Sequence, residues 1–263
     1  MPHVDTQEVS IYYETKGRGS TIVFLHGFTL DRRMWGTQVE YFSKRFRTLV
    51  YDSRGHGKSG CPESGYSRAD RVRDLAALVE KLRLAPFHIV GLSMGGATAL
   101  GYAIDHPESL LSLTLADTAA AGFQPPPKYK DMRERVESMT IADIKRVWKR
   151  NALFYYARKN PQLRDELAEM MDGHCGNLWT DPQRGTYKDR DDVVLSSKIK
   201  IPTLIFIGEK DKFFLPLAKK LHQNIENSEM DIVSEVGHMV NMEDSNRFNM
   251  RLEQFLDRVE ENR

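Results

Sequence analysis

The sequence predicts an α/β fold, with a doubly wound, mostly parallel sheet between layers of helices. Two observations support this prediction. Short apolar runs alternate along the chain with segments whose apolar residues recur at helical spacing. These runs also lack the polar alternation of a half-exposed strand, which is typical of strands covered on both faces. The repeated β-α-β order then favours right-handed crossovers between parallel strands.

Six strands and two helices are the clearest elements. The predicted strands are Thr21–Leu25, Thr48–Tyr51, His88–Val90, Ser112–Leu115, Thr203–Ile207 and Met230–Val233. One helix follows Ser67, whose side chain is expected to accept a hydrogen bond at the helix N-terminus. The last helix is predicted to place five apolar side chains on one face, namely Phe248, Leu252, Phe255, Leu256 and Val259.

The alternation of strands and helices is interrupted between residues 119 and 195. This segment opens with the run Pro125–Pro127 and continues with three helix-like stretches that contain no good strand. Alternation resumes at Ile201. We therefore expect the first part of an α/β core in residues 1–118, a helical cap in residues 119–195 over the carboxyl edge of the sheet, and the second part of the core in residues 196–263.

The composition argues against charged macromolecular partners. The 263 residues include 38 Lys and Arg against 37 Asp and Glu, which gives a formal net charge of +1. This balance implies no long-range attraction to nucleic acid or to an anionic membrane. The N-terminal stretch is polar, without the apolar core of a signal peptide, and no apolar run is long enough to span a bilayer. We expect a cytoplasmic monomer or small homo-oligomer that acts on a small molecule.

No cofactor and no metal site are predicted. The chain has no P-loop and no Rossmann Gly-x-Gly-x-x-Gly, and the stretch Gly55–Gly57 is too short for a dinucleotide site. The two cysteines, Cys61 and Cys175, are far apart and fit no metal-binding spacing. A disulfide between them stays open, but reduced structural thiols are the expectation.

The stretch GLSMGG, residues 91–96, is the candidate for chemistry. It joins an apolar strand to a predicted helix. Such an abrupt turn strains the residue at the corner, and the small residues Gly91 and Gly95 would let strand and helix approach closely. The hydroxyl of Ser93 would then stand above the sheet edge, beside a helix N-terminus whose Met94 N–H can bind a developing oxyanion. Ser93 is therefore the predicted nucleophile.

Five motifs, in order along the chain, resemble those of the α/β-hydrolase fold family. They are His26-Gly27-Phe28, Asp52 to Ser59, GLSMGG, Gly208 to Asp211, and Gly237-His238. The resemblance covers nearly the whole chain from Ile22 onward, except the cap, and points to the serine esterase and lactonase branch, with similarity to 3-oxoadipate enol-lactonases. It implies an eight-stranded sheet, a Ser-His-Asp triad and no cofactor.

A serine nucleophile needs a base, and His238 is the candidate. It lies in a loop after a predicted strand and matches the last family motif. Asp211, which follows the strand Thr203–Ile207, would orient the base and reproduces the family order of serine, acid and histidine. Asp117 also ends a strand and stays an alternative acid, because some family members carry the acid there. Its other interpretation is a cap for the loop that begins the insertion.

The resemblance also implies roles for residues around the triad. The N–H groups of Phe28 and Met94 would form the oxyanion hole, and His26 would brace the loop that carries Phe28. His56 would shape its own turn, and Asp52 would hydrogen-bond the turn that follows it.

The predicted function is hydrolysis of a carboxylic ester or lactone through an acyl-enzyme. Alternatives on the same triad are a carbon–carbon bond hydrolase, an elimination-type lyase and a perhydrolase, because the fold alone does not choose between them. A small-molecule receptor or signalling module on a hydrolase scaffold is a further alternative. The cap would select the substrate. Trp148 and Trp179 are candidates for lining its pocket, although aromatic residues are more often core, and His174 is expected at the surface.

Overall fold

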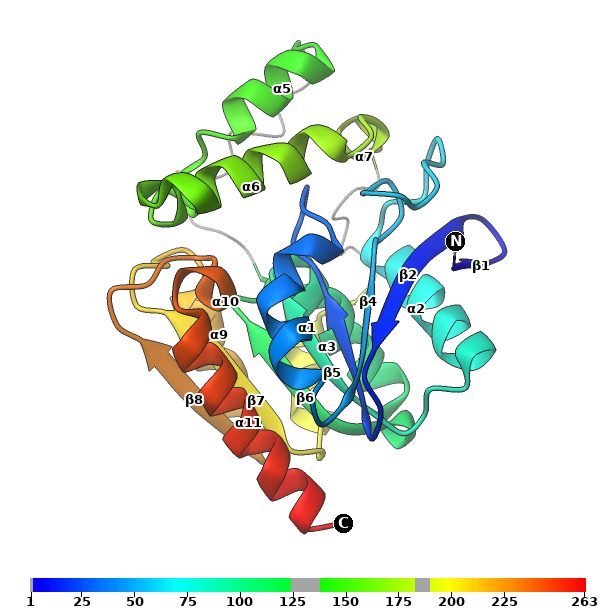
Figure 1. The fold of residues 1–263 in the computed structure, drawn as a ribbon, viewed down its shortest axis with the longest axis vertical. Coiled ribbons are helices and arrows are strands. Elements are labelled where there is room, and N and C mark those ends of the chain that lie inside the picture. Colours follow the sequence, from blue (N-terminus) through cyan, green and yellow to red (C-terminus); the bar gives the residue numbers. More distant parts are fainter. Residues whose placement is uncertain (1, 124–137, 183–189) are drawn as a thin grey trace.

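The computed structural model describes residues 2–123, 138–182 and 190–263, and an eight-stranded sheet lies at its centre (Figure 1). The strands lie side by side in the order β1-β2-β4-β3-β5-β6-β7-β8. Their bounds are β1 (His3–Asp5), β2 (Ser10–Lys16), β3 (Thr21–Leu25), β4 (Arg47–Tyr51), β5 (Phe87–Leu92), β6 (Leu110–Ala116), β7 (Thr203–Gly208) and β8 (Ser228–Val233). The predicted fold class is therefore confirmed.

The sheet is parallel except at one edge. β1 pairs with β2 and β2 pairs with β4 in antiparallel fashion, whereas every pairing from β4 to β8 is parallel. All six predicted strands occur within two residues of their expected bounds at either end. β1 and β2 are not among them, because β2 carries polar residues and is buried only along part of its length.

Helices cover both faces of the sheet. In the core they are η1 (Arg32–Trp35), α1 (Gly36–Phe42), α2 (Arg68–Leu82), α3 (Met94–Asp105), η2 (Pro107–Ser109), α9 (Leu215–Asn224), α10 (Val240–Glu243) and α11 (Ser245–Glu261). Apolar residues of α2, α3 and α9 form one cluster with one face of the sheet, and those of α1 and α11 form a second cluster with the other face. The strands β3, β5 and β7 lie between the two clusters and are buried along their whole length.

Local signals in the sequence account for where these helices begin. Ser67 caps α2, since its Oγ accepts the N–H of Asp70 at 3.2 Å while the Asp70 carboxylate accepts the N–H of Ser67 at 2.8 Å. This reciprocal pair confirms the predicted N-cap. In α11, the five apolar side chains that were predicted to share one face are all buried.

Short helices follow β6 along the chain. They are α5 (Ile141–Trp148), η4 (Ala152–Phe154), η5 (Ala157–Lys159), α6 (Pro161–Gly173), α7 (Asn177–Thr180), α8 (Asp192–Leu195) and η6 (Ser196–Lys198). α5, α6 and α7 stand above one end of the sheet (Figure 1), whereas α8 contacts α3 and α9. The described residues 138–182 are called the cap below.

The boundaries 119 and 195 expected for the inserted segment stay a prediction. The run Pro125–Pro127, with which that segment is expected to open, lies outside the described residues. None of the described helices combines the length and the apolar composition that crossing a bilayer requires.

Candidate active site

Ser93 occupies the sharp turn between β5 and α3. Its φ of 55° and ψ of −112° lie outside the regions that residues other than glycine ordinarily adopt. Main-chain hydrogen bonds hold this conformation, because the Ser93 N–H donates to Ala116 O at 3.0 Å and its C=O accepts the N–H groups of Ala97 and Ala119. The half-buried side chain does not cap α3. α3 begins at Met94, and N–H groups in a first helical turn have no acceptor within the helix.

Two glycines permit this turn. A Cβ on Gly91 would lie 2.5 Å from Gly95 O, and a Cβ on Gly95 would lie 2.3 Å from Leu25 O. Side chains do not tolerate such distances from backbone atoms, so any larger residue would push α3 away from β5 and β3. The close approach of strand and helix that the GLSMGG spacing predicts is therefore present.

The loop after β3, residues 26–30, lies against Ser93 and is called the β3 loop below. A Cβ built on Gly27 would be 3.8 Å from Ser93 Cβ. The C=O of Gly27 accepts hydrogen bonds from His26 Nδ1 at 2.8 Å and from the N–H of Leu30 at 3.2 Å. In a planar trans peptide the N–H points opposite to the C=O. These two contacts therefore constrain the peptide plane that carries the Phe28 N–H.

His238 and Asp211 come together from neighbouring strand ends. Asp211 follows β7, His238 follows β8, and Asp211 Oδ2 lies 2.6 Å from His238 Nδ1. The other carboxylate oxygen accepts the N–H groups of Phe213 and Phe214 at 3.2 Å each. The Phe214 ring also stacks on the imidazole, with 5.1 Å between centroids. With a carboxylate as acceptor, Nδ1 carries the imidazole proton, which leaves Nε2 as the nitrogen that can accept another.

Glu243 holds the loop that carries His238. Its two carboxylate oxygens accept the N–H groups on either side of the histidine, from Gly237 at 2.6 Å and from Met239 at 3.1 Å. Burial raises the pKa of Glu243, against the effect of these two N–H donors. The sequence motifs indicated no role for this residue. The signal that could have identified it is a glutamate five residues after the predicted base, at the end of the one-turn helix α10.

Asp211, rather than the alternative Asp117, hydrogen-bonds His238. The buried Asp117 carboxylate accepts the N–H groups of Gly208 at 2.9 Å and of Val240 at 3.3 Å. Burial, together with the negative charge of Asp211, raises the pKa of Asp117 well above its usual value. Asp117 thus ties the end of β6 to the end of β7 and to the His238 loop, instead of capping the loop that follows it.

Asp117 also links the two halves of the site. The Ser93 N–H donates to the C=O of the residue before Asp117, whose carboxylate accepts the N–H of Val240, two residues after His238. Asp117, Asp211 and His238 have possible ligand atoms within 4.8 Å of one another, a spacing compatible with a metal ion. Those side chains already pair with one another or with backbone N–H groups, so the arrangement fits a hydrogen-bonded network.

Aromatic side chains of the cap cover the β3 loop. The rings of Trp148 and Trp179 meet the ring of Phe28 edge to face, with 5.5 and 4.8 Å between centroids. His174 lies beside them and is buried, so its expected surface position is wrong. Its Nδ1 pairs with Cys175 O, and its Nε2 accepts the Trp179 Nε1–H. Burial lowers the pKa of His174 to about 4, which makes it uncharged at neutral pH.

Cys61 and Cys175 form a disulfide that links the loop after β4 to the cap. The expectation of reduced thiols is therefore wrong. The two residues are 114 positions apart in the sequence, but the N–H of Cys175 donates to Gly55 O at 2.8 Å and so brings the end of α6 to that loop. Only the packing of the cap, which sequence periodicity does not show, makes them neighbours.

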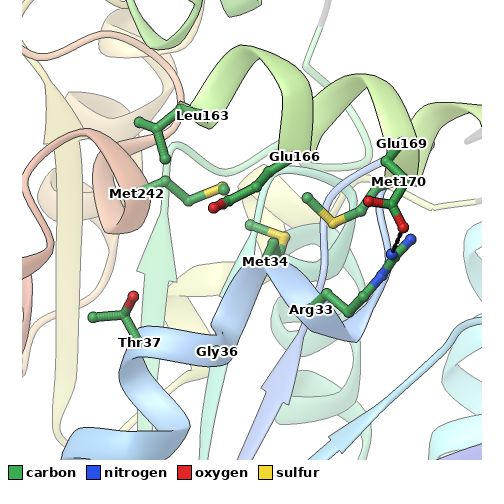
Figure 2. Close-up of a pocket in the computed structure, with 9 residues that line it drawn as sticks. All are labelled: Arg33, Met34, Gly36, Thr37, Leu163, Glu166, Glu169, Met170 and Met242. Carbon is green, nitrogen blue, oxygen red and sulfur yellow. Dashed lines mark hydrogen bonds and ion pairs between the residues drawn. The ribbon is translucent and has the colours of Figure 1, made fainter. Parts of the chain in front are cut away.

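A cavity of about 340 Å³ lies between η1, the start of α1 and α6 (Figure 2). It is lined by Arg33, Met34, Gly36, Thr37, Leu163, Glu166, Glu169, Met170 and Met242. Ser93, Asp211 and His238 do not line it, so this cavity is separate from the predicted triad. One lining residue, Met34, also contacts the β3 loop, because Met34 Sδ accepts the N–H of Gly27 at 3.3 Å.

Known proteins share this architecture over nearly the full chain. A curated relative, the AB hydrolase superfamily protein YisY of Bacillus subtilis, is 30% identical over 263 residues, covering 96% of this chain and 98% of that protein. The structure of Est816, described as an N-acyl homoserine lactone degrading enzyme, is 26% identical with a TM-score of 0.82, over 97% of this chain and 100% of that one.

A thermophilic esterase from Thermogutta terrifontis is 25% identical with a TM-score of 0.85, over 98% of both chains. The alpha/beta hydrolase fold family matches residues 20–245. That match includes all five motifs and most of the sheet, so this chain belongs to the α/β hydrolase fold family, as the motifs predicted.

Proposed function

We propose that this chain is a cofactor-independent serine hydrolase of carboxylic esters or lactones, with Ser93 as nucleophile, His238 as base and Asp211 as the orienting acid. The observations that carry the proposal are the 2.6 Å contact between His238 Nδ1 and Asp211 Oδ2 and the strained turn that holds Ser93 between β5 and α3. The similar lactone-degrading enzyme and esterase support the substrate class.

The proposed reaction has two halves. Ser93 Oγ attacks the carbonyl carbon while His238 Nε2 takes the hydroxyl proton. The N–H groups of Phe28 and Met94 donate to the oxygen that becomes negative. His238 then gives its proton to the leaving alcohol oxygen as the carbonyl–oxygen bond breaks, which leaves an ester on Ser93. Water attacks this ester, His238 takes a proton from the water and returns it to Ser93, and the carboxylic acid departs.

Aromatic rings around the candidate residues support an apolar substrate. Phe28 meets Trp148 and Trp179 edge to face, and the ring of Phe214 stacks on the imidazole of His238. Their faces favour uncharged acyl or alcohol groups. We therefore expect small apolar esters or lactones, rather than nucleic acid or membrane lipid, as partners.

The cytoplasmic location expected from the sequence stays a prediction, and the disulfide makes it testable because such bonds persist mainly in oxidising compartments.

The test compares Ser93→Ala with Ser112→Ala on p-nitrophenyl acetate, p-nitrophenyl butyrate and a series of lactones. Ser112 is a suitable control, because it is a serine whose hydroxyl hydrogen-bonds a histidine, His88 Nδ1, at 2.8 Å. Loss of the nucleophile is expected to lower kcat by roughly 10⁴-fold or more. The Ser112 variant should keep most of the activity.

Peptide mapping after treatment with a p-nitrophenyl phosphonate gives an independent readout. The serine oxygen displaces p-nitrophenolate and stays bonded to phosphorus, so the modified peptide should contain Ser93. Equal turnover by the Ser93→Ala variant and the wild type, or a phosphonate on another serine, would contradict the proposal.

A further inference from the structure

A hydrogen-bonded chain runs from the cap into the β3 loop. Trp148, the last residue of α5, donates from its indole Nε1–H to Thr29 Oγ1 at 2.6 Å. The Thr29 hydroxyl donates in turn to Phe28 O, also at 2.6 Å. A hydroxyl has one proton to donate and can accept another, so Thr29 can make both bonds at once. The chain therefore joins a cap side chain to the carbonyl of the proposed oxyanion residue.

Hydrogen bonds also hold the peptide between Phe28 and Thr29. Thr29 is buried and has a φ of 64°, which a β-branched residue rarely adopts. Its N–H donates to His56 Nε2 at 3.1 Å. Burial lowers the pKa of His56 well below its usual value, which keeps Nε2 available as an acceptor at neutral pH. Both ends of the peptide between Phe28 and Thr29 therefore have a partner, the C=O through the Thr29 hydroxyl and the N–H through His56.

These contacts determine where the Phe28 N–H points. The peptide before Phe28 is held at Gly27 O by His26 and Leu30, and the peptide after it is held by Thr29. Only the two torsions at Phe28 join these fixed planes. Loss of the bond from Trp148 would free the Thr29 hydroxyl to rotate, so the second plane would no longer be tied to the cap.

We propose that Trp148 is a positioning residue that orients the oxyanion donor Phe28 through Thr29. The position of the cap on the β3 loop then affects the rate of the chemical step. This inference rests on the proposed function, because it takes the Phe28 N–H as a donor to the transition state. Removing one oxyanion donor lowers kcat by about 10²–10³-fold. A donor that is present but poorly aligned should cost less, so roughly a 10- to 100-fold loss is expected.

The experiment compares Trp148→Phe with Trp179→Phe. Both tryptophans lie in the cap and both meet the Phe28 ring edge to face, but the Trp179 indole N–H donates to His174. Trp148→Phe should lower kcat on p-nitrophenyl butyrate by roughly 10- to 100-fold with little change in KM, because an oxyanion forms only after binding. Trp179→Phe should lower kcat clearly less than Trp148→Phe does, because its indole N–H donates to His174 and is not part of the chain to Thr29.

Variants of Thr29 test the chain itself. Thr29→Val removes the hydroxyl and keeps the branched shape, so it should lower kcat as much as Trp148→Phe does. The double variant should be no slower than either single variant, since both break the same chain. Thr29→Ser, which restores a hydroxyl, should recover most of kcat. Three outcomes would overturn the inference. They are losses of kcat that multiply in the double variant, a change in KM alone, and equal effects of Trp148→Phe and Trp179→Phe.

The rate of phosphonate labelling separates this inference from the proposed function. The phosphoryl oxygen of the probe takes the place of the oxyanion, so Trp148→Phe and Thr29→Val should both slow the labelling of Ser93. If the wild type is not labelled at Ser93, the proposed function fails. If Ser93 is labelled at the same rate in all variants, the proposed function stands and the role of Trp148 fails.

Discussion

In the described part of the chain, two sets of serine, histidine and carboxylate side chains lie at opposite ends of the parallel strands. These ends are called the carboxyl edge and the amino edge below. The candidate site is at the carboxyl edge. At the amino edge, Ser112 Oγ lies 2.8 Å from His88 Nδ1, and His88 Nε2 lies 2.8 Å from Glu260 Oε1. His88 and Ser112 are cross-strand neighbours on β5 and β6, and Glu260 belongs to the last turn of α11. The side-chain chemistry of the two sets is therefore similar.

The two sets differ in the backbone conformation at their serines. Ser112 lies within the strand β6 and its side chain is buried, so no substrate can reach it. Ser93 lies half-buried on a strained turn with a helix N-terminus directly behind it. A serine, a histidine and an acid therefore do not make a site by themselves. The strained turn that carries the Ser93 hydroxyl and the helix N-terminus that follows it distinguish the carboxyl edge.

The acids of the two sets should differ most in their effect on activity. Asp211→Asn keeps the shape but no longer stabilises the imidazolium or the Nδ1–H tautomer of His238, so we expect kcat to fall by roughly 10⁴-fold. Glu260→Gln should leave kcat nearly unchanged. Asp117→Asn should cause a much smaller loss than Asp211→Asn, since Asp117 bonds backbone N–H groups instead of the imidazole.

Steady-state kinetics on p-nitrophenyl butyrate measure all three variants. Circular dichroism melting shows whether each variant is folded at the assay temperature. Equal losses for the Asp211 and Asp117 variants would mean that the two carboxyls act as one unit. A large loss for Glu260→Gln in a folded protein would remove the distinction between the two edges.

The cap at the carboxyl edge should also depend on the disulfide for its stability, whereas the amino edge has no such link. The disulfide ties the cap to the loop after β4 and closes a long segment of chain, because the two cysteines are 114 positions apart in the sequence. Reduction should lower the free energy of unfolding by about 2–4 kcal/mol, the usual range for native disulfides. Urea unfolding with and without a phosphine reductant measures this difference. A variant with Cys61→Ser and Cys175→Ser should be as unstable as the reduced wild type and should not respond to the reductant.

Thiol titration under denaturing conditions supplies the check on that experiment. The oxidised wild type should show no reactive thiols before reduction, because the structure has no free cysteine. An unfolding midpoint that stays constant after complete reduction would contradict a stabilising link between cap and core.

The parts of this molecule that the sequence predicted are those encoded by neighbouring residues. Gly91, Ser93 and Gly95 lie within five positions, so their spacing alone implies the sharp turn and the close approach of β5 and α3. The partnership of Asp211 and His238 joins two strand ends, and the order of family motifs indicated it before the geometry did.

The parts that were not predicted depend on contacts between distant segments. The Cys61–Cys175 disulfide spans 114 positions, and the bond from Trp148 to Thr29 spans 119. Both exist because the cap settles on the loops after β4 and β3, which no local period specifies. Glu243 is five positions from His238 in the sequence, but it accepts backbone N–H groups, and a glutamate at that spacing does not by itself specify those partners.

The pH dependence of stability and of activity should belong to different histidines. Burial lowers the pKa of His88, although the facing Glu260 carboxylate acts against this and Arg263 acts with it. In the unfolded chain a histidine takes up a proton near pH 6.5. The contribution of His88 to stability is therefore present above about pH 6.5 and is lost as the pH falls toward its lowered folded-state pKa.

His88→Gln, which cannot titrate, should therefore make the free energy of unfolding fall less steeply between pH 7 and pH 5. The same variant should leave the pH profile of kcat/KM unchanged, because His88 lies at the amino edge, away from the candidate site. Urea unfolding and initial rates at matched pH values measure the two effects. A shift of the activity profile in His88→Gln would mean that the amino edge takes part in the chemistry, and the contrast between the two serine–histidine–acid sets would no longer hold.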